Sequence, residues 1–207
     1  MEIILALALG VTLSAASGFR IFLPPLVMSL AAISGNLQLS SGFEWVGTYP
    51  TAIALGIATV VEILAYYIPV VDNFLDTIEI PTAIAIGTLL TAANLGDMDP
   101  LLQWSIAAIA GGGTAGIIET FTAMTRVSST GITGGTGNFL VATAEALSSG
   151  VLTILAFTVP FLAAALVIGL LILAFSKLPK LISTWRSKRQ RGKGVVSNVR
   201  KDTASHK

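Results

Sequence analysis

Long runs of hydrophobic residues, separated by short polar stretches, make up most of the chain before residue 177. A helix needs about 20 predominantly apolar residues to cross a bilayer. We therefore expect an all-α, polytopic transmembrane helix bundle of about six membrane elements. Four apolar runs predict spanning helices directly: residues 51–71, 80–96, 101–118 and 151–175.

One apolar stretch, residues 3–34, is too long for a single straight helix, which would extend over more than about 45 Å. Pro24 lacks a backbone N–H group and disfavours helix in the residue before it, and Pro25 adds a second interruption. We therefore expect a helix, a break near residues 17 to 25 that includes Gly18, and a second helix.

The composition agrees with a membrane protein. The chain is 54% hydrophobic and 11% charged, whereas soluble domains carry about 25% charged residues. It contains no cysteine, and its single histidine is His206. Disulfides, thiol catalysis, Ser–His triads and zinc sites built from Cys or His are therefore excluded. We expect neither a bound metal nor a cofactor.

Basic residues are concentrated at the end of the chain. Residues 177–207 hold ten of the twelve Lys and Arg residues and one of the eleven acidic residues. The positive-inside rule places this partly disordered tail on the cytoplasmic side of an inner or an internal membrane. Its expected partner is anionic lipid headgroups and not nucleic acid. The remaining residues, 1–176, form the predicted transmembrane domain. Its first residues lack the basic n-region of a cleaved signal peptide, so we expect them to be retained.

A coarse internal repeat divides the membrane domain into halves 1–99 and 100–176. Each half has a glycine-containing helix with an arginine, followed by a helix with a glutamate. Three membrane elements in each half would make the halves inverted, which is a common plan among transporters with a site on broken helices. The residues that repeat are Arg20 and Glu62 in one half, and Arg126 and Glu145 in the other.

Two glycine-rich stretches each admit two interpretations. "AGGGTAG", residues 110–116, predicts close packing between helices, either within the chain or in a homo-oligomer. "RVSSTGITGGTGN", residues 126–138, predicts an exposed loop or a re-entrant loop that lines a cavity. The Lys-Ser/Thr of a phosphate-binding Walker loop is missing from it.

Several motifs together carry a resemblance: "SAASGFRIFLPPL", "VEILAYYIPVVDNFLDTI", "GGGTAG" and "GNFLVATAEAL". The chain resembles a family of small bacterial integral membrane proteins catalogued only as a domain of unknown function, four-one-two-six. The resemblance covers roughly residues 5 to 175 and excludes the basic tail. It implies no activity. The family pattern matches at Gly18, Arg20, Pro24, Glu62, Pro69, Asp72, Asp76 and Glu145.

Arg20 and Arg126 are the only basic residues before residue 177. Arginine stays protonated in proteins, and a charge at the bilayer centre costs about 2.5–3.5 kcal/mol. Both side chains should therefore lie inside the bundle and contact acidic groups. Glu119 lies seven residues before Arg126 on the same helical face. The candidate partners are Glu62, Glu119 and Glu145.

These residues admit three interpretations. In the first, the two guanidinium groups bind a carboxylate or phosphate and the glutamates relay protons. The protein is then a transporter, channel or flippase for an anionic small solute or lipid headgroup, which is our leading hypothesis. In the second, the charges are fixed ion pairs of a structural or assembly protein of a membrane complex. In the third, Arg20 lies at the membrane edge and reaches the headgroups.

A second acidic motif lies between Pro69 and Pro81. Asp72, Asp76 and Glu79 fall at i, i+4 and i+7, which predicts one acidic stripe on a short amphipathic helix. This stripe is an interfacial surface, a partner of an arginine, or a magnesium site in a lipid-phosphate enzyme. Because no nucleophile–base pair accompanies it, we do not expect an enzyme.

Overall fold

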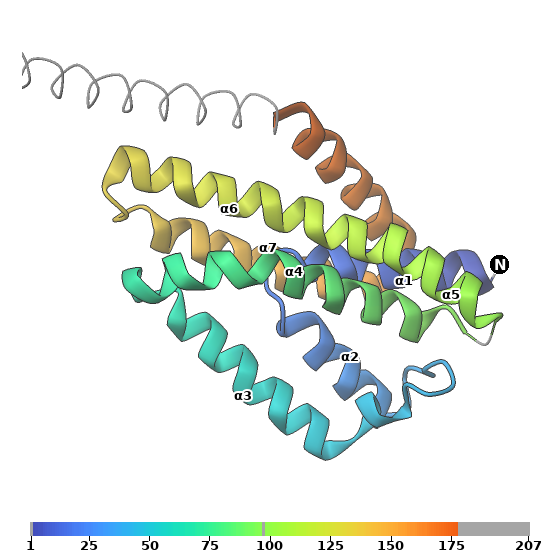
Figure 1. Ribbon diagram of the computed structural model, residues 1–207. Coiled ribbons are helices and arrows are strands. Elements are labelled where there is room, and N and C mark those ends of the chain that lie inside the picture. Colours follow the sequence, from blue (N-terminus) through green and yellow to red (C-terminus); the bar gives the residue numbers. More distant parts are fainter. Residues whose placement is uncertain (1, 97, 178–207) are drawn as a thin grey trace, which may run out of the picture. The chain divides into compact units, whose positions relative to one another are not determined.

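The structure is a computed structural model (Figure 1) that describes residues 2–96 and 98–177. The chain divides into two units, residues 1–171 and residues 172–207, and the first contains the helix bundle. Every regular element in the described residues is a helix, which confirms the all-α fold. The basic tail after Lys177 lies outside the described residues.

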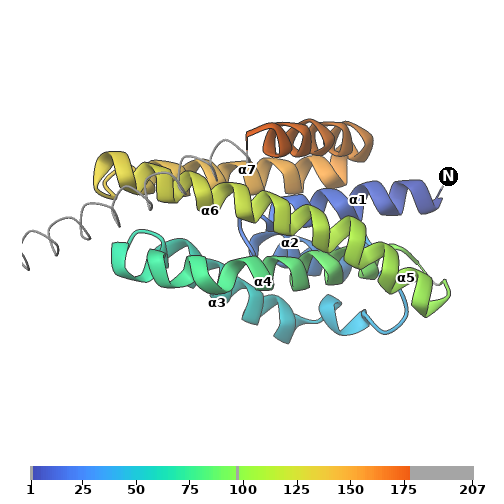
Figure 2. The same ribbon diagram turned by 45° about the horizontal axis from the view of Figure 1, so that its top comes forward.

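Short connections join successive helices of the bundle (Figures 1 and 2). After a break at Val159 the chain continues as a further helix, Pro160–Lys177. The elements before it are α1 (Glu2–Ser17), α2 (Leu23–Ile33), the 3₁₀ helix η1 (Glu44–Gly47), α3 (Tyr49–Ala65), α4 (Pro69–Asn94), α5 (Pro100–Ile106), the π-helix η2 (Ala107–Gly112), α6 (Gly113–Thr133) and α7 (Asn138–Thr158).

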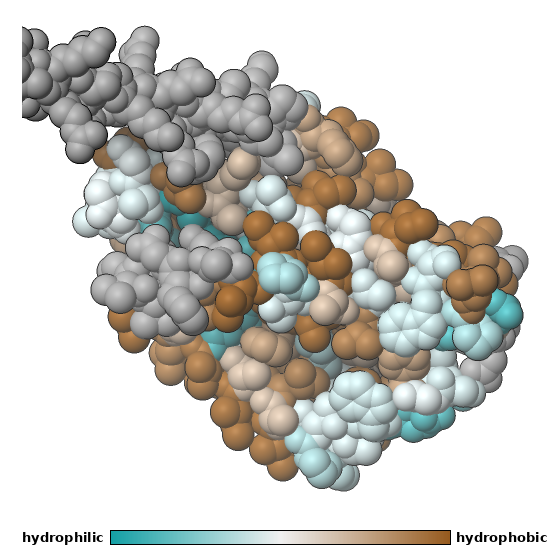
Figure 3. Space-filling view, in the orientation of Figure 1, coloured by the Kyte–Doolittle hydropathy of each residue, from teal (hydrophilic) through white to brown (hydrophobic). Residues whose placement is uncertain are grey.

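In the described residues, three helices are long and apolar enough to cross a membrane, namely Pro100–Thr133, which joins α5, η2 and α6, then Asn138–Thr158 and Pro160–Lys177. The outer surface is also apolar. On α3, Ile53 and Ile57 are each more than 60% exposed, and hydrophobic side chains cover much of the face seen in Figure 3. Soluble monomers rarely expose large apolar patches. The chain is therefore an integral membrane protein.

The expected break in the first apolar stretch lies at residues 18–22, between α1 and α2. Pro24 and Pro25 lie in the first turn of α2, where a missing N–H group leaves no helical hydrogen bond unmade. The prolines thus begin the second helix. Gly18 follows the end of α1 and allows a close approach to α6, because a Cβ there would lie 2.6 Å from the carbonyl oxygen of Ala115 on α6.

Helix α4 corrects one prediction. The expected short helix between Pro69 and Pro81 and the expected separate span from residue 80 are one continuous helix, Pro69–Asn94, with Pro81 in its interior. Proline is tolerated inside membrane helices because neighbouring groups satisfy the backbone that it leaves free. Pro81 was therefore a misleading boundary signal.

The glycine-rich stretch after Arg126 is also different from expectation. Helix α6 continues to Thr133, so neither an extended loop nor a re-entrant loop occupies residues 126–133. A tight turn of four residues then leads to Asn138, and Gly134 and Gly135 in it have φ angles of 65° and 92°. Glycine adopts this left-handed conformation without a steric penalty.

Small residues allow α1, α4 and the π-helix η2 to cross closely. Ser14 Oγ donates to the Gly87 carbonyl oxygen at 2.6 Å and lies 2.9 Å from Thr91 Oγ1. At Gly111 a Cβ would overlap Thr91 Oγ1. The "AGGGTAG" stretch thus packs helices together within the chain, and its use in a homo-oligomer stays a prediction.

Candidate functional site

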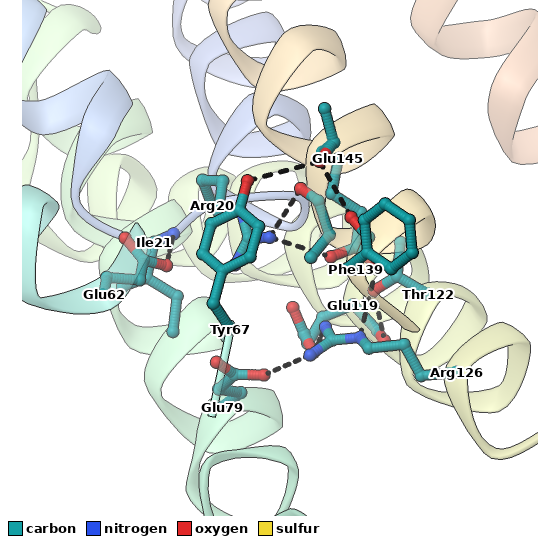
Figure 4. Close-up of polar contacts among 12 residues, drawn as sticks. Arg20, Ile21, Glu62, Tyr67, Glu79, Glu119, Thr122, Arg126, Phe139 and Glu145 are labelled. Carbon is teal, nitrogen blue, oxygen red and sulfur yellow. Dashed lines mark hydrogen bonds and ion pairs between the residues drawn. The ribbon is translucent and has the colours of Figure 1, made fainter. Parts of the chain in front are cut away.

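Six buried charged residues from different helices lie together near the α1–α2 break (Figure 4). None of their side chains is more than 7% exposed. They come from the break itself and from α3, α4, α6 and α7. We call this group the charged cluster; its members are Arg20, Glu62, Glu79, Glu119, Arg126 and Glu145.

Glu145 of α7 joins the two arginines. Its Oε2 lies 3.4 Å from Arg20 Nη2, and its Oε1 lies 3.2 Å from Arg126 Nε. Arg20 Nη2 also donates to the carbonyl oxygen of Ala142, one turn earlier on α7, at 2.7 Å. One carboxylate therefore lies between two guanidinium groups that are 106 residues apart in the sequence.

Arg126 of α6 contacts two further carboxylates. Nη1 lies 3.4 Å from Glu79 Oε2 on α4, and Nη2 lies 3.5 Å from Glu119 Oε1, two turns earlier on α6. With Glu145, three carboxylates surround this single guanidinium group. The expected common face of Glu119 and Arg126 is present, and their long side chains close the gap between the two turns.

Glu79 is a partner of an arginine, which is one of the three interpretations given above for the acidic stripe. It is 3% exposed and contacts Arg126, so it belongs to the charged cluster and not to an exposed stripe. The side chains of Asp72 and Asp76 lie outside the described residues. In the described part of the chain, no group of three or more His, Cys, Asp or Glu side chains is arranged to hold a metal ion.

Glu62 of α3 binds the backbone at the break and not an arginine. Its Oε1 accepts from the Ile21 N–H at 2.7 Å, and its Oε2 accepts from the Phe22 N–H at 3.1 Å. Phe22 is the N-cap residue of α2. The first N–H groups of a helix lack internal partners and favour negative charge. This carboxylate therefore satisfies the backbone groups that the break leaves free.

Tyr66 is a member of the site that sequence reasoning missed. The centroid of its ring lies 3.8 Å from Arg20 Cζ and 4.6 Å from Arg126 Cζ. Cation–π contacts of this kind stabilise a buried guanidinium by about 2 kcal/mol. The available signal was its position four residues after Glu62, which places both on one helical face.

The charged cluster lies toward one end of the membrane helices. Arg126 is seven residues before Thr133, the end of α6, and Glu145 is seven residues after Asn138, the start of α7. At 1.5 Å per residue both lie about 10 Å from the turn that joins these helices. A cavity between α2, α3 and α4 lies elsewhere and is apolar, with Met28 in its lining.

These features define a class: an α-helical integral membrane protein with ionisable side chains inside its membrane domain, a position that marks functional sites by default. The chain belongs to the family described as Domain of unknown function (DUF4126), whose model matches residues 7–180. The resemblance expected from the sequence motifs is thereby confirmed. No curated protein and no solved structure matches the chain.

Proposed function

We propose that the protein is a small membrane transporter that binds an anionic solute, or an anionic lipid headgroup, between Arg20 and Arg126. The observation that carries this proposal is the carboxylate of Glu145, which lies within 3.4 Å of both guanidinium groups. A carboxylate or phosphate of a ligand offers the same charge and the same acceptor oxygens. We call the position of this carboxylate the anion site, for which Glu145 and the ligand compete.

Arg20 has hydrogen-bond donors that a ligand could use. It is 2% exposed, and its Nε and Nη1 have no hydrogen-bond partner among the residues that the structure describes. Buried donors of a charged group are costly to leave unmatched. The planar guanidinium fork can bind two oxygens of one ligand at once, so an oxyanion would satisfy these donors.

Displacement of Glu145 couples anion binding to a proton. The side chain is 3% exposed, and a buried carboxylate that loses its cationic partners is destabilised by about 3–5 kcal/mol. Glu145 therefore takes up a proton as the ligand arrives. One anion and one proton enter together, and the total charge of the site stays the same.

Flux measurements in proteoliposomes test the proposal. Acetate and phosphate serve as solute probes, and a fluorescent anionic phospholipid tests headgroup movement in a separate arm. We expect saturable, proton-coupled uptake of a solute probe, or lipid movement, by the wild type. Arg20→Gln should abolish it, whereas Lys177→Gln, which removes a positive charge far along the chain, should retain it. Equal rates for both variants would contradict the proposal.

A structural role is the second candidate, because the ion pairs of the charged cluster connect the α1–α2 break with α4, α6 and α7. Removing one partner of a buried ion pair is strongly destabilising in either case. The two roles differ in flux. Wild-type vesicles that transport none of the probes, together with an Arg20→Gln variant that unfolds more easily, would favour the structural role.

A further inference from the structure

The charged cluster holds more carboxylates than cations. Four glutamates accompany two arginines, and all six side chains are buried. If every carboxylate were ionised, two negative charges would have no cationic partner. Uncompensated buried charges are destabilising by several kcal/mol each, so the structure must neutralise or stabilise the two excess charges in another way.

Glu62 accounts for one of them. It accepts from two backbone N–H groups, of Ile21 and Phe22, at the N-terminus of α2. Such positions stabilise a carboxylate through hydrogen bonds and the helix dipole, without a cation. The second excess charge falls on the pair that contacts Arg126 at its two terminal nitrogens, Glu79 and Glu119.

Glu79 Oε2 lies 3.4 Å from Arg126 Nη1 and Glu119 Oε1 lies 3.5 Å from Arg126 Nη2, so these two buried carboxyl groups share one guanidinium group. Ionised carboxylates only accept hydrogen bonds, and a carboxyl group donates only when it is protonated. We infer that Glu79 and Glu119 share one buried proton, so that the pair carries a single negative charge. When two carboxyl groups interact this closely, the proton belongs to the pair and not to either residue.

The shared proton determines the charge that the anion site requires. Arg20 and Arg126 together carry two positive charges, and the Glu79–Glu119 pair balances one of them. One positive charge is left, which Glu145 balances in the structure. A ligand that replaces Glu145 should therefore be a singly charged anion. This charge selection rests on the proposed function, whereas the shared proton does not.

The unmatched donors of Arg20 point to the same ligand class. Nε and Nη1 of this buried side chain have no hydrogen-bond partner in the described part of the chain. Glu119 and Glu79 contact Arg126 and leave Arg20 to Glu145 and the Ala142 carbonyl. A small monoanion with two acceptor oxygens, such as a monocarboxylate, fits both the remaining charge and the free donors.

Infrared spectroscopy tests the shared proton directly. A protonated carboxylic acid has a C=O stretching band that is separate from the bands of ionised carboxylates. We expect this band in the wild-type protein at neutral pH, and we expect its loss in Glu119→Gln or in Glu79→Gln. Glu44→Gln, at an exposed carboxylate, should keep the band. If the wild-type spectrum lacks the C=O band of a protonated carboxylic acid, the inference is overturned whatever the flux data show.

Flux then tests the charge selection. In Glu119→Gln the carboxylate of Glu79 is left ionised beside a neutral amide. The pair therefore keeps one negative charge, and acetate should remain preferred over succinate. The double variant Glu79→Gln/Glu119→Gln removes that charge. We expect the ratio of succinate flux to acetate flux to rise by about tenfold in this double variant, because the site then requires one more negative charge from its ligand. An unchanged preference would refute the selection, and a wild type inactive with both probes would refute the proposed function alone.

Discussion

Replacing Glu62 with glutamine measures how strongly the α1–α2 break depends on one carboxylate. Glutamine can accept only one of the two hydrogen bonds that Glu62 accepts, from Ile21 and Phe22. The lost charge-assisted bond contributes about 1.5–3 kcal/mol, and the N–H group left without an acceptor costs about 1–3 kcal/mol. Glu62→Gln should therefore lower the free energy of unfolding by about 2.5–6 kcal/mol.

Reversible unfolding by SDS in mixed detergent micelles, followed by circular dichroism, gives this free energy. The matched control is Glu44→Gln, because Glu44 also accepts from a backbone N–H, that of Gly42, at 2.9 Å, but in an exposed position. Water can replace that hydrogen bond, so Glu44→Gln should change the free energy of unfolding by less than about 1 kcal/mol. Equal effects of the two variants, or stabilisation by Glu62→Gln, would refute the role assigned to the carboxylate.

Two further predictions concern close packing and the aromatic ring. Gly111→Ala should destabilise the bundle by about 1–3 kcal/mol in the same unfolding assay, because its Cβ would overlap Thr91 Oγ1. Gly113→Ala should be neutral or stabilising by up to about 1 kcal/mol, because no neighbouring element lies within 4 Å of its Cβ position. A similar loss of stability in the Gly111 and Gly113 variants would show that η2 and α4 do not cross as described. Tyr66→Phe should keep most of the stability and Tyr66→Leu should lose about 2 kcal/mol, since only the leucine variant removes the cation–π contacts. If the phenylalanine variant lost as much as the leucine variant, the contribution would come from the hydroxyl group.

The arginines could be recognised from the sequence because their environment is so unusual. Arg20 and Arg126 are the two basic residues of a long apolar region, and burial of a permanent charge requires acidic partners. The break between α1 and α2 followed from the length of the apolar run. These are consequences of single-residue chemistry and of helix dimensions, so they do not depend on knowing which helices are neighbours.

Glu79 and Tyr66 could not be placed in this way. Glu79 fits a local acidic stripe, and only the contact between α4 and α6 shows that it points to Arg126. Tyr66 looks like one of several interfacial aromatic residues until two guanidinium groups, from distant segments, are found on its ring. Pro81 misled for a related reason, because its effect on the helix depends on the groups around it.

Anion binding by Glu145→Gln tests the central claim most directly, that this carboxylate occupies an anion site between Arg20 and Arg126. Isothermal titration of the purified protein with acetate, in buffers of different ionisation enthalpy, gives both the affinity and the number of protons taken up. The neutral amide no longer competes, so the variant should bind acetate at least about tenfold more tightly than the wild type, without proton uptake. Arg20→Gln should not bind acetate. A Glu145→Gln variant that binds acetate no better than the wild type would contradict the account.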